Sequence, residues 1–311
     1  MRLAIILGIC TLVLLAGCAF RTGTSIQEVN VHTGTKGITL TFLDQGATRA
    51  TYADSATAVT YELANEGAHD VEGGVLSIGV EDDFLQLEGD RVRQFTIDGK
   101  SLGFPEGDRQ IQTVQLRTKS LPPQTETVTT TVAVNVCYPY LTEASLTPCV
   151  DTDVFGRVAT KPCRASAISL GSQGAPVAVT RIEPSYTQMS DPNLVRAEFI
   201  IHVRNAGGGQ LFEVDKIFEA CTPQALGRDS WNVATIRAYL GDQQLDCTPK
   251  KAGLAGLDGH LVLAKTEDFV RCGLPGGLHK SLGTFTGTMR VEVEYGYTFT
   301  TTRQLQIRRL V

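Results

Sequence analysis

The chain has 311 residues, of which 42% are hydrophobic, 20% charged and 7% aromatic, and its formal net charge is −5. This length suffices for about two domains with their own cores, and the composition is too hydrophobic for a disordered chain. The acidic balance offers no basic surface for nucleic acid, and the glycines follow no collagen-like triplet.

The first twenty residues are typical of an export signal. The stretch from Leu3 to Phe20 carries no charge and lies between Arg2 and Arg21, which is the layout of a secretory leader. Its exit, Leu15-Ala16-Gly17-Cys18, resembles the lipobox of prokaryotic lipoproteins. That resemblance implies cleavage before Cys18 and a lipid on the Cys18 thiol.

Two alternatives to the lipoprotein leader stay open. The apolar stretch is just long enough to cross a bilayer, so residues 1–20 could remain as an uncleaved signal anchor. A conventional cleaved signal would instead release a soluble protein. All three place the rest of the chain outside the cytoplasm.

From Ile38 onward, apolar residues alternate with polar ones, which predicts β-strands. A first strand carries Ile38, Leu40 and Phe42 on one face, and a second ends at Asn65-Glu66-Gly67. The layout returns later, where a strand with alternating apolar residues over 197–203 ends at Asn205-Ala206-Gly207. One module is therefore predicted to occur twice.

The closing strands of the two copies repeat as well. Tyr138 and Tyr140 correspond to Tyr295 and Tyr297 at one constant offset, and the second copy is longer. The additional residues fall between Asn205 and the last strand, where a short helix is predicted over 211–221. Such an insertion is a natural place for whatever distinguishes the second copy.

Short strands at this spacing predict an all-β protein of two tandem immunoglobulin-like antiparallel β-sandwiches after an N-terminal signal or anchor helix. The glycines and proline of residues 171–176 mark the boundary between the copies. The predicted domains are residues 24–172 and residues 176–311, the second with the insertion.

Six cysteines follow the leader, and behind an export signal they are disulfide candidates. Cys149 and Cys163 flank a turn-like stretch, and Cys247 and Cys272 flank a glycine-rich one, so each pair can close a loop. Cys137 and Cys221 are less certain. They could join the two domains, but two buried free thiols are the favoured prediction. Cysteine and histidine spacings offer no zinc motif.

Acidic residues concentrate in the first copy, with the run Glu81-Asp82-Asp83 at their centre. These three are weak calcium candidates, and Asp151 with Asp153 forms a second, weaker one. The carboxylates lack the EF-hand spacing, so a soluble acidic surface without a bound metal is the favoured interpretation.

No catalytic motif was found in the sequence. A nucleophile elbow, a phosphate-binding glycine loop and a His-Glu-x-x-His helix are all missing from it. We therefore expect a protein without catalytic residues or cofactor that is not an enzyme. An extracellular hydrolase is a distant alternative.

The strands that end at Gly67 and Gly208 resemble the core strand of immunoglobulin-like modules of the prokaryotic cell-adhesion-related type. The segment 174–180 and the strand Cys137-Tyr138-Pro139-Tyr140 are similar to those of uncharacterised archaeal surface proteins with tandem domains. The resemblance implies an extracellular scaffold or binding module, attached to the membrane through its N-terminus. We expect a protein partner, and the alternative is an accessory structural subunit of a secretion or pilus complex.

Overall fold

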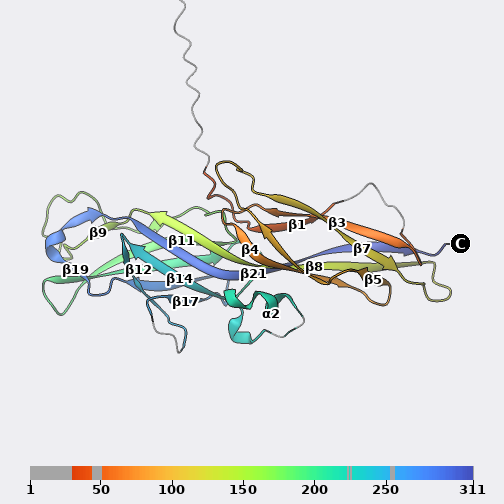
Figure 1. The fold of residues 1–311 in the computed structure, drawn as a ribbon. Helices are drawn as coiled ribbons and strands as arrows, with labels where there is room; N and C mark the ends of the chain where they lie inside the picture. Colours follow the sequence, from red (N-terminus) through yellow and green to blue (C-terminus); the bar gives the residue numbers. More distant parts are fainter. Residues whose placement is uncertain (1–29, 44–50, 223, 225, 253–255, 311) are drawn as a thin grey trace, which may run out of the picture. The chain divides into compact units, whose positions relative to one another are not determined.

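A computed structural model describes residues 30–43, 51–222, 224, 226–252 and 256–310. The described chain is mostly β-strand with a few short helical turns (Figure 1), so the predicted all-β class is confirmed. The expected signal or anchor helix, residues 1–20, lies outside the described residues.

The strands are of very unequal length, from two residues to twenty. Those of the first half are β1 (Ile38–Phe42), β2 (Thr51–Tyr52), β3 (Ala56–Asn65), β4 (Val71–Val80), β5 (Leu85–Glu88), β6 (Val92–Ile97), β7 (Arg109–Thr118), β8 (Thr127–Leu146) and β9 (Cys149–Asp151). Those of the second half are β10 (Ile168–Ser169), β11 (Val177–Gln188), β12 (Leu194–Asn205), β13 (Gln210–Phe212), β14 (Val233–Leu240), β15 (Gln243–Gln244), β16 (Asp246–Thr248), β17 (Gly259–Val262), β18 (Glu267–Gly273), β19 (Leu278–His279), β20 (Thr284–Thr286) and β21 (Met289–Arg308).

The short helical elements all lie in the second half. They are η1 (Val214–Lys216), α2 (Ile217–Cys221), η2 (Arg228–Ser230) and η3 (Lys280–Leu282). The helix predicted over 211–221 is therefore present in shortened form, because residues 210–212 pair as strand β13 with β21 instead.

Three sheets build the body of the protein. A four-stranded sheet has the order β1-β3-β7-β5, and a six-stranded sheet has the order β10-β11-β12-β18-β16, with β19 beside β12. The third sheet has nine strands along the path β15-β14-β21-β8-β4-β6, with β2, β13 and β17 attached to it. One hydrophobic core runs between these sheets through both halves of the chain.

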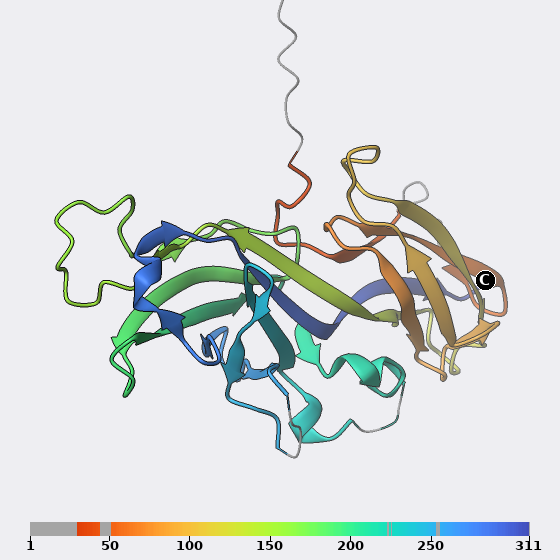
Figure 2. The same ribbon diagram turned by 60° about the vertical axis from the view of Figure 1, so that its left-hand side comes forward.

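The centre of the nine-stranded sheet is a long ladder that belongs to both halves. Strands β8 and β21 pair antiparallel over their whole lengths, from Met289 opposite Leu146 to Arg308 opposite Thr127. Figures 1 and 2 show β21, in blue, running from the half with β11 and β12 into the half with β3 and β7. The last long strand of each half, β8 or β21, therefore pairs with the last long strand of the other half.

The two halves repeat the same hydrogen bonds at the Asn-x-Gly turns. Asn65 Nδ2 donates to the His69 carbonyl at 2.8 Å, and Asn205 Nδ2 donates to the Gly209 carbonyl at 2.7 Å. The side-chain oxygens of Asn65 and Asn205 accept from Gly67 N and Gly207 N, respectively. Both asparagines thus close a short side-chain turn at the end of an inner strand.

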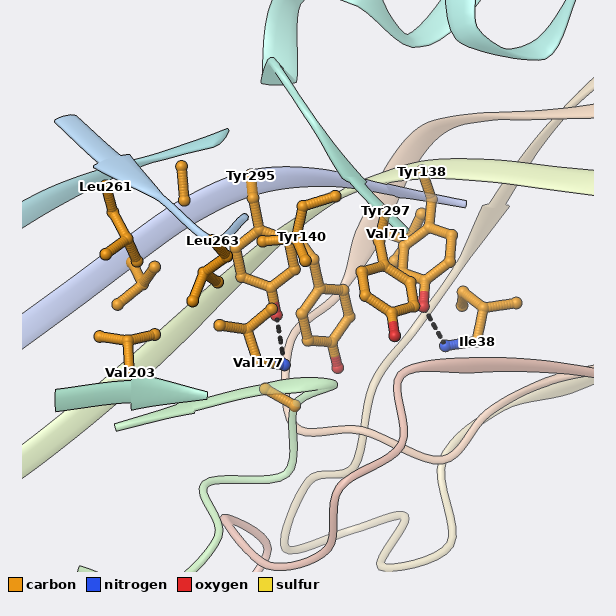
Figure 3. Close-up of a cluster of buried hydrophobic side chains, with 14 of the residues drawn as sticks. Ile38, Val71, Tyr138, Tyr140, Val177, Val203, Leu261, Leu263, Tyr295 and Tyr297 are labelled. Atoms are coloured by element: carbon orange, nitrogen blue, oxygen red, sulfur yellow. Dashed lines mark hydrogen bonds between the residues drawn. The ribbon is translucent and has the colours of Figure 1, made fainter. Parts of the chain in front are cut away.

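Four buried tyrosines mark the point where the halves meet (Figure 3). Tyr140 lies opposite Tyr295 in the ladder, and Tyr138 lies opposite Tyr297, so a local two-fold axis passes between them. The Tyr138 hydroxyl accepts from Ile38 N at 3.3 Å, and the Tyr295 hydroxyl accepts from Val177 N at the same distance. The tyrosines therefore fix the start of β1 and the start of β11 in the same way.

The insertion in the second half interrupts the counterpart of β4. In the first half, β4 pairs with β8 as one strand. In the second half, two strands take the corresponding place beside β21: β13 before residues 213–232 and β14 after them. Residues 31–311 form one compact unit. The boundaries 24–172 and 176–311 and the immunoglobulin-like type stay predictions.

Candidate functional site

The six cysteines of the described residues form three disulfides, Cys137–Cys221, Cys149–Cys163 and Cys247–Cys272. The second and third are the two pairs that the loop spacing favoured. Cys247 and Cys272 lie directly opposite each other on β16 and β18. Three disulfides indicate an oxidising setting, extracellular or periplasmic.

The expectation of free thiols at Cys137 and Cys221 is wrong. Cys137 on β8 points to the outer face of the nine-stranded sheet, and Cys221 at the end of α2 covers it in a small buried cluster with Val75 and Phe212. Sequence separation concealed this pair, because only the folding of the insertion onto that face brings the two sulfurs together.

Cys18, the expected lipid anchor, lies outside the described residues. No helix among the described residues is both long and apolar enough to cross a membrane.

The acidic run at residues 81–83 is occupied by other contacts. Asp82 forms an ion pair with Arg91 at 2.6 Å, and Glu81 accepts a hydrogen bond from Thr130 at 3.1 Å. Within residues that the structure describes, no three His, Cys, Asp or Glu side chains are grouped so as to hold a metal ion. Asp151 and Asp153 are likewise engaged, since Lys161 pairs with both.

A cleft of ≈ 560 Å³ lies in the second half. Strand β14 forms its floor with Val233, Ala234, Thr235 and Arg237, of which Val233 and Ala234 are buried. The start of the insertion, residues 213–215, forms one wall. The other wall consists of these described residues between β16 and β17: Lys250, Lys251, Gly256, Leu257 and Asp258.

Charged groups of both signs line the cleft. Arg237 on the floor donates to Glu294 at 2.7 Å and to Asp258 at 3.0 Å. Burial works to lower the pKa of Arg237, but its hydrogen bonds to the two carboxylates outweigh that effect and raise the pKa above its ordinary value. The floor therefore carries a permanent cation that is already neutralised.

A second ion pair joins the two walls of the cleft. Lys251 contacts Glu213, so the segment between β16 and β17 is linked to the insertion. Lys250 fixes its own segment by donating to the carbonyls of Gly256 and Asp258. Lys250 and Lys251 thus hold the lining segments in place while they line the cleft themselves.

His260 on β17 is the one titratable group of the cleft with a perturbed proton affinity near neutral pH. Partial burial, together with the positive charge of Lys251, lowers its pKa. The imidazole is therefore mainly neutral at pH 7 and offers both a donor and an acceptor nitrogen.

This arrangement suits the binding of a polar segment that carries both charges. Carboxylates, two lysine ammonium groups and a neutral imidazole line the cleft. Sequence reasoning singled out the insertion between Asn205 and the last strand but none of the lining residues. Arg237 could have been found as the charged outward position of an otherwise apolar strand.

No known protein family matches the chain, and no curated protein matches it. Similar solved structures include the secreted serine protease VesC from Vibrio cholerae, at 9% identity over 82% of this chain and 50% of the protease chain, with a TM-score of 0.20. The chain thus spans about half the length of that protease. Two others are a DUF4466 family protein from Parabacteroides merdae (9% identity, 83% of this chain, 99% of that chain, TM-score 0.16) and a non-toxic crystal protein from Bacillus thuringiensis (9% identity, 88% and 78%, TM-score 0.14).

The match to a secreted serine protease corrects the prediction that this protein is not an enzyme, and that exclusion is withdrawn. A TM-score of 0.20 carries no argument about fold or activity, so no reaction is assigned to the chain either.

Proposed function

We propose that this protein is an extracellular binding or scaffold protein, tethered to the outer face of the membrane by a lipid on Cys18. The leader with its lipobox-like exit supports the tether, and three disulfides support an oxidising compartment. We also propose that residues 24–172 and 176–311 are two copies of one immunoglobulin-like module. The repeated turns at Asn65 and Asn205 support that proposal.

The cleft between the insertion and the segment after β16 is the proposed binding site for a protein partner. The observation that carries this is the set of charges of both signs that line the cleft, together with the Lys251–Glu213 pair that joins its two walls. When a partner loop with acidic and basic side chains binds, its charged groups would lose their hydration water and form ion pairs with these charges. Charge complementarity of this kind gives specificity more than affinity.

Crosslinking with mass spectrometry in native membranes tests the proposal. The wild-type chain is compared with Lys251→Glu and with the double variant Glu213→Lys/Lys251→Glu, which keeps an ion pair but exchanges its positions. We expect both variants to lose crosslinks from the cleft to the partner by roughly tenfold, as a reversed charge costs more than one kcal/mol. A double variant that restores full crosslinking would reduce the pair to a structural role and contradict the proposed site.

A second candidate, a structural subunit of an envelope complex, is favoured by one observation. The continuous β8–β21 ladder joins the two halves without a flexible linker, which suits a rigid spacer. Stoichiometric crosslinks to a single neighbour that do not involve the cleft would support this candidate.

A further inference from the structure

The loop between β6 and β7 displays two large apolar side chains to solvent. Leu102 is 80% exposed and Phe104 is 71% exposed, although both belong to an ordered loop. Ser101 N donates to the Phe104 carbonyl at 3.0 Å, and Phe104 N donates to the Ser101 carbonyl at 3.1 Å. The tip is therefore a closed turn that holds Leu102 and Phe104 away from the core.

Backbone hydrogen bonds connect this loop indirectly, through Gly67, Ala68 and Gly174, to the start of the compact unit. Gly174 N donates to the Gly34 carbonyl, and the Gly174 carbonyl accepts from Ala68 N at 2.7 Å. The next link is Lys100 N, which donates to the Gly67 carbonyl at 2.7 Å. The first residues of the unit and the β6–β7 loop thus share one side of it, whereas α2 lies on the opposite side in both views (Figures 1 and 2).

We infer that Leu102 and Phe104 insert into the lipid bilayer and orient the protein on the membrane, an inference that rests on the proposed tether at Cys18. Residues 19–30 amount to about a dozen residues, which span at most on the order of 40 Å when fully extended. The tether joins the unit at residue 31, so it keeps the side of the unit that carries residue 31 within reach of the bilayer. That side carries the apolar tip, and apolar side chains at the interface gain by leaving water.

The aspartates at the base of the loop indicate which lipid headgroups the loop can approach. Asp70, Asp98 and Asp108 line a hollow of ≈ 260 Å³ at the base of the loop, together with Phe104. Carboxylates so close to the headgroups oppose an anionic lipid surface. The loop therefore inserts into zwitterionic lipid, and its contact does not depend on anionic headgroups.

Tryptophan quenching by brominated acyl chains tests the inference on the full chain purified from membranes. The only native tryptophan is replaced by Trp231→Phe, and either Phe104→Trp or the control Phe218→Trp on α2 is added. Phe218 is 49% exposed. In vesicles of brominated phosphatidylcholine we expect at least about twofold quenching at position 104 and none at position 218, with no gain on adding anionic lipid.

Three outcomes would overturn the inference and distinguish it from the tether. If the protein sediments with the vesicles through Cys18 but position 104 is not quenched, the loop inference fails and the tether stands. If wild type and Cys18→Ala both stay out of the vesicle pellet, the tether and the loop contact fail together. Equal quenching at positions 104 and 218 would show contact without the proposed orientation.

Discussion

The four tyrosine hydroxyls at the local two-fold axis are buried, but each has a hydrogen-bond partner. Tyr297 donates to Asn205 Oδ1 at 3.0 Å and accepts from Gly209 N at 2.7 Å. Burial raises the pKa of all four phenols, and it raises that of Tyr297 to about 12. The neutral phenol is therefore the form that the folded state requires.

This burial predicts loss of stability at alkaline pH. Because the folded pKa lies above the unfolded value of 10, the stabilisation is complete below pH 10 and is lost as pH rises through about 12. Each tyrosine adds a slope of up to about 1.4 kcal/mol per pH unit in that window. Urea unfolding at several pH values from 8 to 12, in steps of about one unit, measures the slope.

The matched variants for the alkaline experiment are Tyr297→Phe and Tyr52→Phe. The first removes one buried phenol and is expected to make the slope shallower, whereas the second changes an exposed tyrosine and leaves it unchanged. A wild-type stability that is flat up to pH 12 would contradict the prediction.

At the scale of elements, the insertion is a cover for the outer face of the nine-stranded sheet. Val75 and Cys137 are apolar residues on that face, and the side chains of Ile217 and Trp231 pack around their cluster. The disulfide Cys137–Cys221 attaches this cover to β8. It also connects the two halves of the chain, since Cys137 lies in the first half and Cys221 in the second.

Removing the Cys137–Cys221 bridge is expected to cost more stability than removing Cys149–Cys163. The two bridges close sequence separations of 84 and 14 residues, which correspond to about 4–5 and about 3 kcal/mol of chain entropy. Chemical unfolding of the paired Cys→Ala variants measures the difference. Hydrogen exchange over residues 213–232 should rise in the Cys137→Ala/Cys221→Ala variant alone, and equal exchange in both variants would contradict the assignment.

For the whole unit of residues 31–311, the shared ladder predicts a single cooperative unfolding transition. Gly67 and Gly207 report on the two halves, because a Cβ on Gly67 would meet the Tyr140 hydroxyl at 1.8 Å and one on Gly207 would meet Pro176 Cβ at 2.5 Å. Alanine at either position is expected to cost about 2–3 kcal/mol.

Calorimetry of these variants decides whether the halves unfold together. We expect Gly67→Ala and Gly207→Ala to lower the same Tm, whereas Gly227→Ala, whose Cβ would meet open space, leaves it unchanged. Two transitions, each moved by one variant only, would mean that the halves unfold independently despite β8 and β21.

The repeated turns could be predicted because their signals are local. Alternation along β3 and β12 and the turn residues at Asn65 and Asn205 are short-range features, and they recur with constant spacing. The cleft could not be predicted in the same way. Its floor, at Arg237 and Glu294, joins residues on two strands whose pairing depends on the whole second half.

The sequence by itself determined the β class, the repeated turns and the pairs Cys149–Cys163 and Cys247–Cys272, because each depends on side-chain periodicity or on a short loop. Tertiary structure alone decided that β8 and β21 serve both halves, that Cys221 meets Cys137, and that the insertion borders a charged cleft. The physical reason is the distance along the chain between the residues that interact. Periodicity shows which face of a strand is buried, but its partners are chosen where apolar faces and unpaired backbone groups far apart in the chain come together.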